Sequence, residues 1–212
     1  MNLKKVSVLA SAFLTVGSAV ARSQVCVGSP TRGGVSYVNT RTTATKGNGG
    51  SLSFVPGRFA IGVSGKVIDS PPDQDGFGGA LRLSLVLGKR LKVCPTLGAG
   101  VDRLTWDTQS DAKVTTDAAT ARGGIGIGYD IAAFRNFGIA PFIIGEFVER
   151  GYHFKTEAAE NDPTDTGTWK GKAEGTYGVL AHYSRVFAGL SLSRRSAKGA
   201  PAERLIYGGF AF

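Results

Sequence analysis

Apolar and polar residues alternate with a period of two along most of the chain after residue 33. In the segment 80–87, four leucines occupy every second position, with Arg82 and Ser84 between them. Segment 123–131 repeats the pattern with isoleucines and a tyrosine against glycines, and segment 59–67 repeats it with Phe, Ile and Val. Because successive side chains of a strand point to opposite faces, the pattern predicts β-strands with one apolar face.

The strands are separated in turn by tight turns and by longer polar loops. The longest loops are expected at Asp69–Gly76, Asp107–Thr116 and His153–Lys170. This rhythm and an even strand number predict an all-β fold, a closed antiparallel up-and-down transmembrane β-barrel. If residues 33–55 do not form a true hairpin, the barrel has eight strands instead. The ten expected strands are Gly33–Thr43, Gly50–Val55, Arg58–Ile68, Phe77–Gly88, Leu91–Trp106, Asp117–Ile131, Phe137–Tyr152, Gly171–Tyr183, Val186–Arg195 and Glu203–Phe212.

The start of the chain has the layout of a secretory signal peptide. Met1–Lys5 is basic, Val6–Val16 is mostly apolar, and Ala19–Ala21 offers small residues for cleavage. The apolar stretch is too short and too interrupted for a membrane helix. We therefore expect a signal peptide at 1–21, a periplasmic segment at 22–32 and a barrel domain at 33–212. Removing the signal peptide lowers the net charge from +9 to +7.

The end of the chain reads as a strand with an apolar face that includes Ile206, Phe210 and Phe212. Its aromatic ending resembles the C-terminal signature by which bacterial outer-membrane proteins are recognised for assembly, which implies that Tyr207, Phe210 and Phe212 form an assembly signal. A soluble barrel with an apolar interior would show the same alternation. The signal peptide and the ending favour the opposite arrangement, with apolar residues facing lipid.

The whole mature chain resembles bacterial outer-membrane β-barrel domain proteins of the small, ten-stranded kind. The resemblance implies a monomer in the outer membrane of a Gram-negative cell, with tight turns in the periplasm and long loops outside. Its implied partners are outer-membrane lipids, lipopolysaccharide and the barrel-assembly machinery. The basic residues are scattered, so nucleic acid is not an expected partner. The layout is generic and indicates no activity.

Two cysteines, Cys26 and Cys94, occur in a chain expected to enter an oxidising compartment. The predicted topology places both on the periplasmic side. One disulfide is expected, worth about 4 kcal/mol if it acts by closing a long loop in the unfolded chain. The alternative is two unpaired thiols, and the spacing fits no metal motif.

Alternation places a set of polar side chains inside the barrel. An eight-stranded interior is just filled by side chains and a ten-stranded one is only slightly wider, so we expect an ion-pair network that fills the lumen. The alternative is a narrow polar pore for small solutes. The inward residues are Arg58, Lys66, Arg82, Asp102, Asp130, Glu146, Glu174 and His182.

One pair offers catalytic chemistry. His182 precedes Ser184 by two residues, which resembles the pair in outer-membrane lipid A deacylases, where a serine nucleophile needs an adjacent base. Arg185 replaces that family's asparagine, no Glu follows before Glu203, and Ser184 falls on an expected turn. The main hypothesis is therefore a non-enzymatic protein with a structural or surface-interaction role and no cofactor or metal. A deacylase-like esterase is the second hypothesis.

Overall fold

Antiparallel strands make up nearly all of the described chain. The computed structural model describes residues 33–42, 46–70, 74–88, 90–107, 113–134, 137–157, 164–196 and 202–212. Within these ranges no helix is long and apolar enough to cross a membrane. The strands are β1 (Gly33–Arg41), β2 (Lys46–Phe54), β3 (Phe59–Ser70), β4 (Gln74–Leu85), β5 (Leu91–Asp107), β6 (Lys113–Tyr129), β7 (Ile131–Phe134), β8 (Phe137–Glu157), β9 (Thr164–Tyr183), β10 (Val186–Arg195) and β11 (Glu203–Ala211).

The sheet closes on itself. Apart from β6 and β7, each strand pairs with its neighbour in sequence, and β1 pairs with β11 from Gly34↔Ala211 to Arg41↔Arg204. β6 and β7 follow one another across Asp130 and both pair with β8, so they occupy a single strand position. The fold is thus a closed ten-stranded antiparallel barrel, and the prediction of ten strands rather than eight is confirmed.

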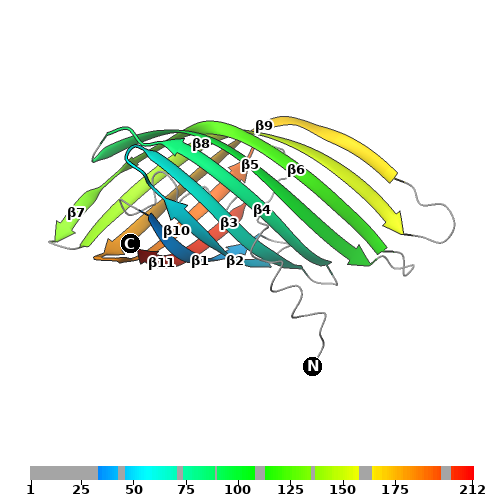
Figure 1. Cartoon of the computed structure of the whole chain (residues 1–212), viewed down its shortest axis with the longest axis horizontal. Helices are drawn as coiled ribbons and strands as arrows, with labels where there is room; N and C mark the ends of the chain where they lie inside the picture. Colours follow the sequence, from blue (N-terminus) through cyan, green and yellow to red (C-terminus); the bar gives the residue numbers. More distant parts are fainter. Residues whose placement is uncertain are drawn as a thin grey trace, which may run out of the picture.

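Most strands are longer than their sequence pattern predicts. The expected strands leave Lys46–Gly49 in a loop, but it belongs to β2, whose register with β1 and β3 is continuous. β8 and β9 likewise extend into the expected loop at His153–Lys170. Figure 1 shows this hairpin reaching beyond its neighbours at the end of the barrel opposite β7 and the C-terminus.

The outer wall is apolar and the interior is polar at mid-height. Leu83 is 48% exposed on the outside, whereas the adjacent Arg82 is 1% exposed on the inside. The predicted outward residues Ile125, Ile127 and Phe59 are also exposed. The apolar residues therefore face outward, which excludes the alternative of a soluble barrel with an apolar interior. This is the pattern of a transmembrane barrel.

Tight turns join the strands at the end where the barrel closes near the C-terminus. Gly57 has a φ of 69° and Ser184 a φ of 53°, and both lie in short hairpin turns. The backbone amide of Phe212 donates to the carbonyl of Gly33 at 3.2 Å, which ties the end of the chain to the start of β1. We call this end of the barrel the turn end and the opposite end the loop end.

The interior also holds two clusters of buried apolar side chains. One cluster of buried side chains comes from β1, β8, β9, β10 and β11, and a second joins β5 to β8. We call these two clusters, which the sequence pattern did not predict, the apolar layer. Its members are Val38, Ala140, Leu180, Phe187, Leu205 and Tyr207 in the first cluster and Cys94, Phe142 and Ile144 in the second.

The last strand divides the residues of the expected assembly signal between two faces. Phe210 and Phe212 are exposed on the outer wall, as the alternation predicts. Tyr207 points the other way and is buried in the apolar layer.

Candidate functional site

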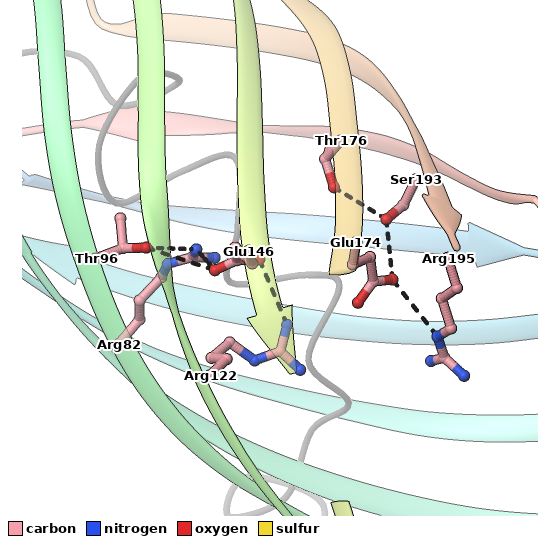
Figure 2. A network of polar contacts seen from close by, with 8 residues as sticks. All are labelled: Arg82, Thr96, Arg122, Glu146, Glu174, Thr176, Ser193 and Arg195. Atoms are coloured by element: carbon pink, nitrogen blue, oxygen red, sulfur yellow. Dashed lines mark hydrogen bonds and ion pairs between the residues drawn. The ribbon is translucent and has the colours of Figure 1, made fainter. Parts of the chain in front are cut away.

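A buried group of charged residues occupies the middle of the lumen. Arg82 of β4 donates from Nη2 to Oε1 of Glu146 on β8 and, at 3.2 Å, to the hydroxyl of Thr96. Arg122 of β6 lies on the other side of the same carboxylate, with Nη1 3.7 Å from Oε2 of Glu146. Figure 2 shows both guanidinium groups directed at this carboxylate. We call Arg82, Thr96, Arg122 and Glu146 the central cluster.

Glycines on the neighbouring strands make room for these long side chains. A Cβ atom at Gly98 would lie 3.1 Å from Cγ of Arg122. A Cβ atom at Gly124 would lie 2.8 Å from Cγ of Glu146 and even closer to the backbone oxygen of Gly145. The glycine-rich part of β6 therefore serves packing inside the barrel, as expected for close approach within a sheet.

A second carboxylate lies beside the central cluster. Glu174 on β9 is the direct cross-strand partner of Glu146. Its Oε1 accepts a hydrogen bond from Ser193 at 3.2 Å and lies 3.5 Å from Nε of Arg195 (Figure 2). Ser193 also exchanges a hydrogen bond with Thr176 at 2.9 Å. Each glutamate thus has its own cationic partner.

Two further ion pairs involve predicted inward residues. Asp102 lies 3.4 Å from Arg150 on the loop side of the central cluster, and Asp130 lies 2.7 Å from Lys92 near the turn end. Of the predicted inward set, Arg82, Asp102, Asp130, Glu146 and Glu174 take part in ion pairs.

The remaining predicted lumen residues lie outside these pairs. Arg58 is exposed in the turn between β2 and β3, so its prediction as an inward residue is wrong: the strand starts one residue later, at Phe59. Lys66 is partly buried on the inner face of β3. His182 is partly buried beside Gly138 near the turn end.

The proposed catalytic pair is not brought together as a pair on one strand. His182 lies on β9, whereas Ser184 lies in the two-residue turn with a positive φ and an exposed side chain. No hydrogen bond joins the two among the described residues. The spacing of two residues implies a shared face only where the strand continues, and here it has ended.

The structure offers no ready ligand set for a metal. Within the described residues, no group of three His, Cys, Asp or Glu side chains could hold an ion. Cys94 is fully buried in the apolar layer. Its expected partner Cys26 and the expected signal peptide lie outside the described residues, so the disulfide and the cleavage site remain predictions.

Several cationic partners escaped the sequence reading. The cations of these ion pairs are Arg122, Arg150, Arg195 and Lys92, and each lies on the inner face of its strand. Alternation alone could have placed them there. It could not pair them, because which residues lie beside each other depends on the register of the closed barrel, and the Arg150–Asp102 pair also joins two strands that are not adjacent.

Comparisons with known proteins identify the fold and no closer relationship. No protein-family model matches the chain, and no curated protein matches it. The translocator domain of the autotransporter NalP from Neisseria meningitidis is similar in structure, with a TM-score of 0.50 at 10% identity over 85% of this chain and 87% of that chain. The outer membrane protease OmpT from Escherichia coli has a TM-score of 0.46 at 9% identity, over 84% of this chain and 94% of that chain. The N-terminal β-barrel domain of OprF from Pseudomonas aeruginosa has a TM-score of 0.37 at 13% identity, over 85% of this chain and 96% of that chain.

Proposed function

We propose that this chain is an integral outer-membrane β-barrel protein with a structural or surface-interaction role and an occluded lumen. The mature protein starts after a cleaved signal peptide at 1–21, with 22–32 in the periplasm and 33–212 forming the barrel. The turn end faces the periplasm and the loop end faces outward, as the short and long connections of bacterial barrels are arranged. The barrel is a monomer that uses no cofactor.

The observation that carries the proposal is the burial of Arg82 against Glu146 inside a wall of exposed leucines. An ion pair at 1% side-chain exposure closes the centre of the lumen. Nearer the turn end, Phe142 and Ile144 of β8 pack with Cys94 of β5, two strand positions away. Two successive layers of side chains, one charged and one apolar, support a barrel that excludes solutes rather than one that conducts them.

Conductance in planar bilayers tests the occluded lumen. We expect the purified wild-type barrel to give no steady ion current above the bare bilayer. A wide general porin inserted into the same bilayers serves as the control that an open lumen would give a detectable current. Stable, reproducible wild-type channels would instead establish the narrow pore as the function.

Membrane fractionation tests the location. The wild-type protein should sediment with outer membranes and migrate faster on gels before boiling than after it, as closed barrels do. Recovery in the soluble periplasmic fraction without this shift would contradict the proposal.

The mass of lipid A tests the deacylase hypothesis. Lipid A of unchanged mass after expression is the expected result for a protein that is not a deacylase.

A further inference from the structure

Basic residues gather on the outer wall at the loop end, over four neighbouring strands. Arg41 is the last residue of β1, Lys46 the first of β2, and Arg204 the second of β11. The pairing Lys46↔Arg41↔Arg204 places them in one row across three strands. Arg194 on β10 lies diagonally next to Arg204, because Leu192 is the direct partner of Arg204. We call these four residues the basic row.

Burial on each strand shows that the basic row faces outward. The residues beside Arg41, Lys46 and Arg204 in sequence, namely Thr40, Gly47 and Leu205, are buried in the interior. Ser193 is buried next to Arg194 and bonds to Glu174 in the lumen. Since side chains alternate, all four cations point to the membrane side of the wall, where they are exposed.

The arrangement is one that a bound anion would stabilise. Like charges directly opposite on adjacent strands destabilise a sheet, and Arg41 and Arg204 are such a pair. Of the four residues, only Lys46 has an acidic cross-strand partner, Asp69. Among the described residues, none of the three arginines forms an ion pair with a carboxylate.

The outer wall between the basic row and the turn end is apolar and can contact the hydrocarbon of a membrane. Tyr37, Leu52, Leu190 and Ile206 are exposed on the same four strands. Between this apolar surface and the basic row, Asn48 accepts hydrogen bonds from Asn39 at 2.8 Å and from Tyr37 at 2.7 Å. The surface thus changes from apolar to amide to cationic along the strands.

We propose that the basic row binds the phosphate groups of lipopolysaccharide in the outer leaflet, with its acyl chains against the apolar wall. Arginine guanidinium groups bind phosphate in a bidentate manner, and a polyacylated, phosphorylated saccharide matches the order of surfaces. This site rests on the proposed function, because the row meets the outer leaflet only if the loop end faces outward.

Lipid analysis of purified protein tests the site. The full chain is purified from outer membranes in mild detergent, and bound lipopolysaccharide is quantified by mass spectrometry. We expect Arg41→Gln/Arg204→Gln to retain about tenfold less lipopolysaccharide than wild type, since each cation near an anionic surface contributes measurably to binding. The control Arg58→Gln/Arg185→Gln removes the same charge from exposed turns at the turn end and should retain the wild-type amount.

A second measurement needs no variant. Wild-type protein in phosphatidylcholine nanodiscs should bind lipopolysaccharide and lose most of that binding when the lipid is dephosphorylated. Equal binding of the dephosphorylated lipid, equal retention by the Arg41→Gln/Arg204→Gln variant, or equal preference for phosphatidylglycerol would each overturn the site. An assembled wild-type barrel without lipopolysaccharide overturns only the site, whereas a wild-type chain absent from the outer membrane overturns the proposed function as well.

Discussion

Glu146 and Glu174 lie directly opposite each other on β8 and β9, and each carboxylate is bound by different cations. Two like charges at opposed positions would repel each other. Arg82 and Arg122 bind Glu146, whereas Arg195 and Ser193 bind Glu174 (Figure 2). The two opposed glutamates are therefore neutralised by three arginines, Arg82, Arg122 and Arg195, which come from three different strands.

Removing the carboxylate of Glu146 should be costly. The variant Glu146→Gln leaves Arg82 and Arg122 buried without their counter-ion, a change that costs about 3–5 kcal/mol when one partner of a buried pair is lost. Urea unfolding of the lipid-reconstituted barrel measures the loss. The matched control is Asp117→Asn, which breaks a half-exposed pair with Arg103, at 2.5 and 2.7 Å, and should cost less than about 1 kcal/mol. Equal costs for the two variants would contradict the buried network.

The neighbouring glutamate should matter less. In the Glu174–Arg195 pair the arginine side chain is 43% exposed, so it can be hydrated when the carboxylate is removed. Glu174→Gln should therefore destabilise the barrel by less than Glu146→Gln in the same unfolding experiment. The reverse order would show that the two carboxylates do not have the separate partners described above.

The sequence predicted which face each residue occupies better than it predicted contacts. Alternation placed the leucines of β4 outside and Arg82 inside, because side-chain direction in a strand depends only on local geometry. It missed the apolar layer, since Phe187 and Ile144 are as apolar as the lipid-facing residues and hydrophobicity therefore does not distinguish the two faces of their strands there. It misassigned Lys46–Gly49 because pairing with β1 and β3 overrides a turn-like composition.

Two neighbouring glycines provide a contrast in packing. An added Cβ at Gly124 would meet Glu146, whereas one at Gly145, which lies across from Ile125 on the outer wall, would meet nothing within 4 Å. Gly124→Ala should therefore lower the free energy of unfolding by about 1–3 kcal/mol through overpacking, and Gly145→Ala should leave it nearly unchanged. The heat-modifiable fraction and the urea midpoint give the comparison. A tolerated Gly124→Ala would show that the interior is looser than described.

The predicted disulfide has a simple test. Denatured, unreduced protein should show one intramolecular Cys26–Cys94 bond as faster migration on a gel, and it should resist alkylation until a reductant is added. The variant Cys26→Ser should then expose one reactive thiol after denaturation. Free alkylation of both thiols in the unreduced wild type would rule out the bond.

Protease treatment of intact cells tests the orientation. Cleavage should occur in the loop-end connections, above all 158–163, which joins the long β8–β9 hairpin, because these connections face outward in the proposed topology. The turn at Ser184–Arg185 should be cut only after the outer membrane is permeabilised. Cleavage at that turn in intact cells would invert the orientation and place the basic row in the periplasmic leaflet.

The orientation of the barrel wall is tested most directly on β4, where leucines alternate with Arg82 and Ser84. Nitroxide labels can be attached to single cysteines placed at each position from 80 to 85, in a chain carrying Cys26→Ser and Cys94→Ser and reconstituted into bilayers. Oxygen concentrates in the hydrocarbon, so its collision rate with each label reports exposure to lipid.

The decisive measurement is the pattern of these oxygen collision rates along β4. We expect maxima at Leu81, Leu83 and Leu85 and minima at Arg82 and Ser84, with a period of two. Equal rates along the segment, or maxima at Arg82 and Ser84, would contradict a barrel that presents its leucines to lipid and encloses its charges.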